Sequence, residues 1–246
     1  MSDLKVIVLA AGKGTRMMSE AANLPKVMRQ ALGKPLLHYV LSALDFVDPA
    51  DTVLVTGFLS ETVRAAFPAY PAALQQPQLG TGHAVQCARQ YLEGFQGTVL
   101  VCYGDMPLLR RETYQSLLEA HRASGAACTL LSGTSDLDLP YGRVMQDAAG
   151  NFLGVVEDRD CTPEQKQIPD LNVGIYCFEN DYLLPALDGL QSNNAQHEYY
   201  LTETPELMLR RGMRVETFRI DDGEALRGVN TPEDLAVCDR ILAAAT

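Results

Sequence analysis

A glycine-rich segment near the start of the chain, residues 11–17, has the composition of a phosphate-binding loop. Gly12 and Gly14 let the backbone bend and approach an anionic ligand, while a lysine and Arg16 add positive charge. The spacing departs from the Rossmann dinucleotide pattern, which needs a third glycine where a methionine stands, and from the Walker pattern. The segment therefore indicates a polyphosphate-binding loop of another kind, or an ordinary turn between a strand and a helix.

A second candidate lies at the end of the apolar run in VLVCYGDMPLL. Tyr103, Gly104 and Asp105 follow a predicted buried strand, and open α/β sheets bind their ligands at the carboxyl ends of strands. Asp105 is a candidate Mg²⁺ ligand, because Mg²⁺ prefers oxygen ligands and usually takes only one or two carboxylates besides phosphates and water. The competing interpretation is an aspartate that caps the following helix.

A third group of candidates lies in the second half of the chain. Glu157 follows the apolar segment LGVV, and Asn172 and Gly174 interrupt the apolar run LNVGIY. A polar residue and a glycine inside an apolar strand often mark close approach of a ligand. These residues, together with the segment YGRV, suggest an acceptor site beside the phosphate-binding loop.

The composition limits the classes of ligand. The chain has 246 residues, is 47% hydrophobic and carries a formal net charge of -11. This charge opposes a nucleic-acid or anionic-membrane surface, since phosphate backbones recruit clustered Lys and Arg. The six cysteines show no metal-site spacing and indicate reduced core residues, as in a cytoplasmic protein. No segment resembles a signal peptide or a membrane span.

The elements that must position these residues alternate in type. Apolar runs of strand length occur in LKVIVLA, DTVLVTGF and GTVLVCYGD, and helical periodicity occurs in LLHYVLSALDFV, in SETVRAAF and over residues 81–92. This alternation predicts an α/β fold with a mostly parallel mixed sheet flanked by helices.

The pattern changes after about residue 126. GRVMQDAAGNFLGVVED predicts a hairpin that turns at residues 149–151, and LNVGIYCF predicts a strand, so a small β-rich acceptor or lid region is expected. A helix at about 202–211, a strand at about 215–220 and a helix capped by Thr231 with Pro232 at its first position complete the chain. We expect a single domain over residues 1–246, with a nucleotide-binding half at about 1–125, an acceptor half at about 126–230 and a terminal helix at about 231–246.

The motif LAAGKGTRM, followed shortly by LPKV, resembles the signature of the sugar-1-phosphate nucleotidyltransferases. The resemblance implies a Rossmann-like nucleotidyltransferase fold. It also implies that Arg16 and Lys26 are catalytic, meeting the triphosphate and neutralising charge as pyrophosphate leaves. Without the resemblance, Lys26 would be interpreted as a solvated surface lysine.

The segment LQQPQLGTGHA is similar to the uridylyltransferase branch that acts on N-acetylglucosamine 1-phosphate and forms the N-terminal half of a bifunctional bacterial enzyme. By this resemblance Gln75 reads the uracil edge, and Gly80 and Thr81 line the base pocket. On the residues alone, Thr81 would be a helix cap and Gln75 a surface residue. The full set implied to bind the nucleotide is Leu9, Ala11, Gly12, Gly14, Lys26, Gln75, Gly80, Thr81 and Tyr103.

The resemblance also assigns the acceptor and the metal. It implies that the amino sugar is held by Gly142, Glu157, Asn172 and Thr202, the last from the stretch NAQHEYYLTE. Asn230, from the segment GVN, joins Asp105 as the second ligand of Mg²⁺. No general base is required, because a sugar phosphate is already an anionic nucleophile at neutral pH.

The expected reaction is uridylyl transfer from UTP to N-acetylglucosamine 1-phosphate by in-line attack on the α-phosphorus. The alternatives are a relative that uses glucose 1-phosphate or a TTP or CTP donor, and a catalytically silent nucleotide-sugar-binding subunit. A dinucleotide-dependent oxidoreductase is disfavoured by Met17. Expected partners are UTP and the sugar 1-phosphate, with no nucleic acid or membrane. The hexapeptide β-helix acetyltransferase domain of the long family members is not expected in this chain, and the oligomeric state is left open.

Overall fold

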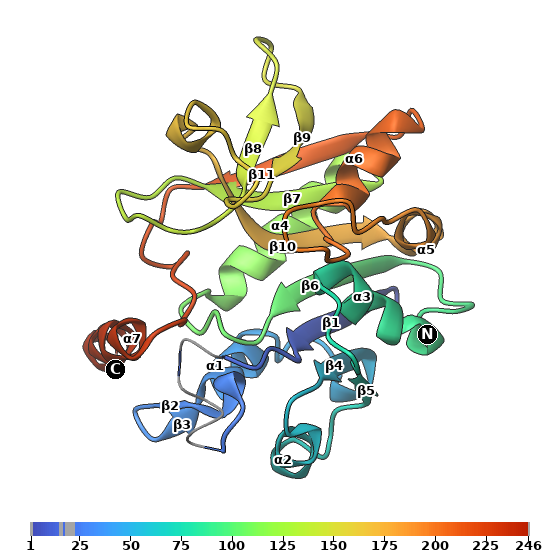
Figure 1. Ribbon diagram of the computed structural model, residues 1–246. Coiled ribbons are helices and arrows are strands. Elements are labelled where there is room, and N and C mark those ends of the chain that lie inside the picture. The colour runs from blue at the N-terminus through green and yellow to red at the C-terminus, as the bar shows by residue number, and fades with distance from the viewer. Residues whose placement is uncertain (1, 15–16, 18–22, 246) are drawn as a thin grey trace.

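The alternating segments of the sequence build a mixed β-sheet with helices on both faces in the computed structural model (Figure 1). The structure describes residues 2–14, 17 and 23–245. Within them, nine strands form the sheet: β1 (Leu4–Ala10), β4 (Thr52–Thr56), β5 (Ala72–Leu74), β6 (Thr98–Tyr103), β7 (Cys128–Gly133), β8 (Arg143–Gln146), β9 (Phe152–Val156), β10 (Leu171–Glu179) and β11 (Val215–Ile220). A separate small hairpin pairs β2 (Gln30–Ala31) with β3 (Lys34–Pro35).

The strand order shows which loops emerge together at one edge of the sheet. The main path runs β11-β7-β10-β6-β1-β4-β5, and the β8–β9 hairpin is joined to β10. Strands β5, β4, β1 and β6 pair in parallel, whereas β10 lies antiparallel to both β6 and β7. The loops that follow β1 and β6 therefore emerge at the same edge of the sheet, where ligands of open α/β sheets bind.

Seven α-helices are described besides short 3-10 turns. They are α1 (Leu36–Ala43), α2 (Ser60–Ala66), α3 (Thr81–Cys87), α4 (Arg111–Ser124), α5 (Asn180–Asp188), α6 (Glu203–Arg210) and α7 (Pro232–Ala244). None of the helices in the described residues has the length and hydropathy needed to cross a membrane.

Successive residues of β1 supply two cores on opposite faces of the sheet. Val6 and Val8 pack in the cluster that contains residues of α1, α2 and α4, and Ile7 and Leu9 pack in the cluster that contains residues of α3, α5 and α6. Val6, Ile7 and Val8 are fully buried. A strand buried on both faces explains why this segment is continuously apolar rather than alternating.

The predicted α/β fold with a mostly parallel sheet is confirmed. The hairpin predicted around residues 149–151 is formed by β8 and β9, and Thr231 caps α7 with a reciprocal bond to Asp234. The helix predicted over residues 81–92 is wrong in extent, because α3 ends at Cys87 and the chain continues as a 3-10 turn at Arg89–Tyr91. All six cysteines lie in the described residues and are free thiols.

Helix α7 packs against the β2–β3 hairpin at the lower left of Figure 1 rather than on the main sheet. The backbone N–H of Leu32 donates to Oδ1 of Asp239 at 2.9 Å, and buried Cys238 lies in the same apolar cluster as Ala31. These contacts hold α7 in place, and with it the end of the loop that connects β11 to α7.

Candidate active site

Two adjoining cavities open where the loops after β1 and β6 emerge. The larger has a volume of about 370 Å³ and the smaller about 190 Å³. Three residues line both cavities: Tyr103, Asp105 and Asn230. A ligand in one cavity would therefore lie next to a ligand in the other, at the boundary that these three residues form.

The larger cavity is lined by the residues predicted to bind a nucleotide. Its lining contains Leu9, Ala11, Gly12, Gly14, Lys26, Gln75, Gly80, Thr81 and Tyr103. The predicted catalytic Arg16 lies outside the described residues. The structure thus brings the described members of the predicted nucleotide set together, and their roles stay predictions.

The glycine-rich loop begins directly at the end of β1. Gly14 has φ +63, in the left-handed region that favours glycine, and its carbonyl accepts from the N–H of Met17 at 2.9 Å. A Cβ on Gly12 would meet no atom of the described residues within 4 Å, so this position borders open space. Gln78, which the sequence analysis did not single out, donates from its side chain to the carbonyl of Ala11.

Gln75 is a buried residue in the lining of the larger cavity, with 5% of its surface exposed. Its amide nitrogen donates to the carbonyl of Gly80 at 2.8 Å and lies 3.2 Å from Nδ1 of His83. Because a carbonyl oxygen can only accept, the amide nitrogen must face Gly80. The carbonyl oxygen of Gln75 is then available to a donor on a ligand.

Close packing against the backbone explains why position 80 is a glycine. Gly80 has φ +109, and a Cβ there would lie 2.6 Å from the carbonyl oxygen of Tyr199. Thr81 is the first residue of α3, and its hydroxyl accepts from the N–H of Leu201 at 3.0 Å. Both residues therefore fasten the pocket wall to the segment that precedes α6, whatever contact they also make with a ligand.

A lysine, an aspartate and an asparagine meet at the boundary of the two cavities. Nζ of Lys26 donates to Oδ2 of Asp105 and, at 2.8 Å, to Oδ1 of Asn230. The Lys26 and Asp105 side chains are 11% and 21% exposed, so this ion pair is partly shielded from water. Two oxygen atoms converge on one cationic group, and such oxygen ligands suit a hard divalent cation.

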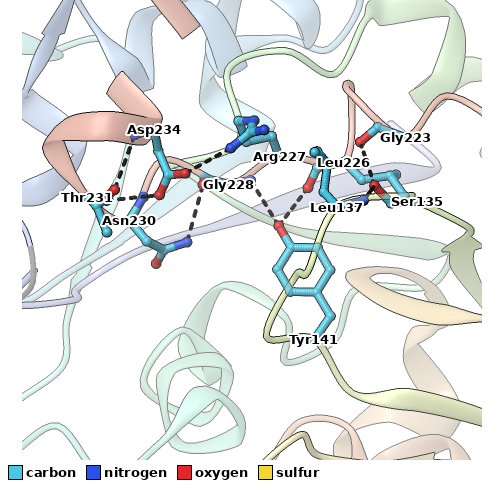
Figure 2. Close-up of polar contacts among 10 residues, drawn as sticks. All are labelled: Ser135, Leu137, Tyr141, Gly223, Leu226, Arg227, Gly228, Asn230, Thr231 and Asp234. Atoms are coloured by element: carbon cyan, nitrogen blue, oxygen red, sulfur yellow. Dashed lines mark hydrogen bonds and ion pairs between the residues drawn. The ribbon is translucent and has the colours of Figure 1, made fainter. Parts of the chain in front are cut away.

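Asn230 is held in place by its own loop (Figure 2). Its backbone N–H donates to Oδ2 of Asp234 at 3.0 Å, and its side-chain nitrogen donates to the carbonyl of Gly228 at 3.2 Å. The preceding residue, Val229, donates its backbone N–H to the carbonyl of Asp105 at 2.9 Å. No group of three or more His, Cys, Asp or Glu side chains suited to a metal occurs within the described residues.

The smaller cavity contains the four predicted sugar-binding residues, Gly142, Glu157, Asn172 and Thr202. The hydroxyl of Thr202 donates to Oε1 of Glu157 at 2.9 Å. Burial raises the pKa of the Glu157 carboxyl, and the Thr202 hydroxyl partly opposes this shift by bonding to the charged form. The site thus holds a carboxylate that is more easily protonated than an ordinary glutamate.

The floor of this cavity is an irregular part of β10. Asn172 donates from its side chain to the hydroxyl of Tyr176 at 2.7 Å, and the pairing with β7 shifts register between these two residues. Gly174 has φ +82, and a Cβ there would lie 2.4 Å from the ring of Tyr103. Glycine is required here by close packing on Tyr103, which lines both cavities.

Residues that the sequence analysis did not single out also contribute to the cavities. His83 and Gln78 contact predicted nucleotide-binding residues, and Glu198 lines the larger cavity. Tyr141 lines the smaller one. The sequence did contain a signal for all four, because Gln78 and His83 lie within LQQPQLGTGHA, Tyr141 within YGRV and Glu198 within NAQHEYYLTE.

The fold is shared with a solved structure of a nucleotidyltransferase. A solved structure from Bacillus anthracis, described as a glucose-1-phosphate thymidylyltransferase in complex with a sucrose, superposes with a TM-score of 0.75 at 16% identity, covering 97% of this chain and 94% of that one. Residues 6–160 match the family model of the MobA-like NTP transferase domain. Because the match spans more than half of the chain, the protein belongs to this family of nucleotidyltransferases.

Curated relatives cover nearly the whole chain. The bifunctional protein GlmU of Pelotomaculum thermopropionicum is 42% identical over 98% of this chain, and that of Synechococcus sp. is 43% identical over 97%. Each alignment covers 52% of the relative, so the chain spans about half the length of the curated relatives it matches. The predicted resemblance to a bifunctional bacterial enzyme is confirmed, and the prediction of a nucleotidyltransferase is confirmed with it.

Proposed function

We propose that the protein is a sugar-1-phosphate nucleotidyltransferase that transfers a uridylyl group from UTP to N-acetylglucosamine 1-phosphate. The products are UDP-N-acetylglucosamine and pyrophosphate. The observation that carries the proposal is the junction of the two cavities, because Tyr103, Asp105 and Asn230 line both. A nucleotide in the larger cavity and a sugar phosphate in the smaller would place donor phosphate and acceptor phosphate on either side of Asp105.

The family generally uses a divalent metal, and we propose that this metal is Mg²⁺. Asp105 and Asn230 would hold it through the two oxygens that already converge on Lys26. Bound there, Mg²⁺ would neutralise charge on the phosphates during transfer. The fit rests on the oxygen ligands and on their partly buried position.

The residues of the chain would contribute orientation and charge. Gly12 and Gly14 lie where the loop after β1 borders the larger cavity, and a backbone without side chains allows close approach of the phosphates. Lys26 would offset the charge that develops on the leaving pyrophosphate, with Arg16 in the same role. The sugar phosphate needs no base, so alignment of the two phosphates is the main requirement.

The two cavities would select base and sugar separately. In the larger, the carbonyl oxygen of Gln75 would accept the N3–H of uracil, since the amide nitrogen is committed to Gly80 and His83. In the smaller, Glu157 and Asn172 would bind hydroxyls and the amide of the acetamido group. The 40–43% identity to the bifunctional proteins GlmU supports this pairing of substrates.

A substrate panel tests the proposal. Pyrophosphate release is measured with UTP, TTP, CTP and GTP against N-acetylglucosamine 1-phosphate, glucose 1-phosphate and glucosamine 1-phosphate, each with Mg²⁺ or with EDTA. We expect a Mg²⁺-dependent signal mainly for UTP with N-acetylglucosamine 1-phosphate. A signal for another pair would overturn the base or the sugar assignment and keep the reaction, and silence for every pair would favour a nucleotide-sugar-binding subunit.

A further inference from the structure

One tyrosine bonds the loop that carries Asn230 to the wall of the smaller cavity (Figure 2). Because this cavity would hold the sugar phosphate under the proposed function, it is called the acceptor cavity below. The hydroxyl of Tyr141 donates to the carbonyl of Leu226 at 2.6 Å and accepts from the N–H of Gly228 at 2.9 Å. It thereby uses its one proton and one lone pair on two points of the same loop. Tyr141 and this loop are about eighty-five positions apart in the chain, so the bonds are tertiary rather than local.

The same tyrosine belongs to the acceptor cavity. Tyr141 lines that cavity together with the adjacent Gly142, whose carbonyl accepts from the N–H of Asn172 at 2.8 Å. The segment of Tyr141 and Gly142 is thus bonded to β10 on one side and to the Asn230 loop on the other. A sugar that contacts Gly142 would therefore contact a segment that also bonds to the loop carrying Asn230.

The bonds continue from the tyrosine to the side chain of Asn230. The N–H of Gly228 bonds to Tyr141, and the carbonyl of Gly228 accepts from the Asn230 side chain at 3.2 Å. With its nitrogen turned toward Gly228, the Asn230 amide directs Oδ1 toward Lys26, 2.8 Å away. Gly228 also packs closely against Tyr141, because a Cβ on Gly228 would lie 3.1 Å from the Tyr141 hydroxyl oxygen.

We propose that Tyr141 is a positioning residue that sets the orientation of Asn230 and couples the acceptor cavity to the metal. This inference rests on the proposed function. It goes beyond that function by assigning the link between sugar binding and metal binding to a single hydroxyl. The rival interpretation is that Tyr141 only packs in the wall of the cavity, in which case its hydroxyl contributes to stability and not to metal binding.

The test is Tyr141→Phe, which keeps the ring and removes the hydroxyl. We expect the Mg²⁺ concentration for half-maximal rate and the KM for N-acetylglucosamine 1-phosphate to rise about five- to tenfold, as for loss of one or two hydrogen bonds, while the KM for UTP stays near the wild-type value. Mn²⁺ binding is measured without turnover, by electron paramagnetic resonance in the presence of UDP-N-acetylglucosamine and no pyrophosphate, and should weaken by a similar factor.

Two further variants separate positioning from packing. Tyr91→Phe removes another tyrosine bond to a backbone carbonyl, that of Ala72 at 3.1 Å, away from both cavities, and should leave Mn²⁺ binding unchanged. In an Asn230→Ala background, Tyr141→Phe should have little further effect, because residues that act as a unit are not additive.

Wild-type Mn²⁺ binding in Tyr141→Phe, or an undiminished effect of that change in the Asn230→Ala background, would overturn the inference and leave the proposed function standing. If the wild-type protein neither turns over UTP nor binds Mn²⁺ with UDP-N-acetylglucosamine, the proposed function fails, and the inference fails with it.

Discussion

Nζ of Lys26 lies 2.8 Å from Oδ1 of Asn230, although 204 positions of sequence separate the two residues. The same ammonium group donates to Asp105, which lies just beyond β6. The contact therefore joins the segment after the glycine-rich loop, the end of a central strand and the loop before the last helix. This convergence of one cation and two oxygens at the junction of two cavities is the structural basis for the proposed chemistry.

Replacement of Lys26 tests the charge at this junction. Lys26→Ala should lower kcat by about 10²–10³-fold, the usual loss when one preorganised charge-stabilising group is removed. The melting temperature should also fall, because Asp105 loses its partly buried partner, so rates are compared at a temperature where both proteins are folded. Initial rates and thermal unfolding measure the two effects. Lys34→Ala, on the exposed side of β3, is the control, and a Lys26→Ala enzyme as fast as this control would contradict the role.

The orientation of the Gln75 amide predicts discrimination between pyrimidines. Its nitrogen is committed to Gly80 and His83, so under the proposed function its oxygen would be the atom that accepts a hydrogen bond from the base. Uracil offers a donor at N3, whereas cytosine offers an acceptor there. Gln75→Leu should therefore reduce the preference for UTP over CTP, measured as the ratio of kcat/KM values, by about 10–100-fold.

The matched control for this change is Gln86→Leu. Gln86 also donates from its amide to a backbone carbonyl, that of Leu187, but it lies outside both cavities. Its replacement should leave the preference for UTP intact. A preference that survives Gln75→Leu as well would remove the base-reading role of Gln75.

The raised pKa of Glu157 predicts a pH dependence on the acceptor side. Burial disfavours the charged carboxylate, so protonation begins at a higher pH than for an ordinary glutamate, and a protonated Glu157 accepts hydrogen bonds poorly. As the pH falls, the KM for N-acetylglucosamine 1-phosphate should accordingly begin to rise before the pH reaches the range in which an ordinary glutamate titrates. The sugar phosphate itself titrates with a second pKa of about 6, so the comparison with Glu157→Gln isolates the protein group. Identical pH profiles for the two enzymes would contradict the prediction.

A buried histidine away from the cavities predicts a pH dependence of stability. His121 is 1% exposed and lies 2.9 Å from the Thr129 hydroxyl and 3.2 Å from Glu179. Burial lowers the pKa of His121, an effect that Glu179 opposes in part. The unfolded chain then takes up a proton near the ordinary pKa of about 6.5 while the folded chain does not, so stability is complete above that pH and is lost as the pH falls.

Urea unfolding between pH 7.5 and about 5 measures this loss. His121→Asn should show a shallower decline in the free energy of unfolding than the wild-type protein. His197→Asn changes an exposed histidine at φ +54, a conformation that asparagine tolerates, and should keep the wild-type decline. Equal slopes in the wild-type and His121→Asn proteins would show that another group titrates.

The fold could be predicted where the pattern was unambiguous. Strands β1, β4 and β6 each contain a continuous apolar run, and Thr231 followed by Pro232 marks the start of α7. The end of α3 was predicted wrongly, because residues beyond Cys87 keep a helical spacing and a tightening into a 3-10 turn leaves that spacing almost unchanged. Helix α5 was not anticipated, since Pro185 lies inside it and proline argues against a helix interior.

The residues that line the two cavities could be predicted from the sequence. The packing contacts that explain why some of those residues occur at their positions could not. Gly80 was expected to line the base pocket, and the structure adds a second reason for glycine there, because a side chain would collide with the backbone of Tyr199. Likewise the link from Tyr141 to the Asn230 loop depends on tertiary contacts that no local pattern contains. Periodicity identifies elements, whereas contacts between distant segments follow only from the folded chain.

The most direct test of the account is the metal dependence of UDP-N-acetylglucosamine formation in the wild-type protein and in Asp105→Asn. Initial rates are measured from UTP and N-acetylglucosamine 1-phosphate over a range of Mg²⁺ concentrations and with EDTA, and thermal unfolding checks that both proteins are folded. We expect a Mg²⁺-dependent wild-type rate and a folded variant with almost no activity at any Mg²⁺ concentration. Full activity in Asp105→Asn, or a wild-type rate that EDTA leaves unchanged, would contradict it.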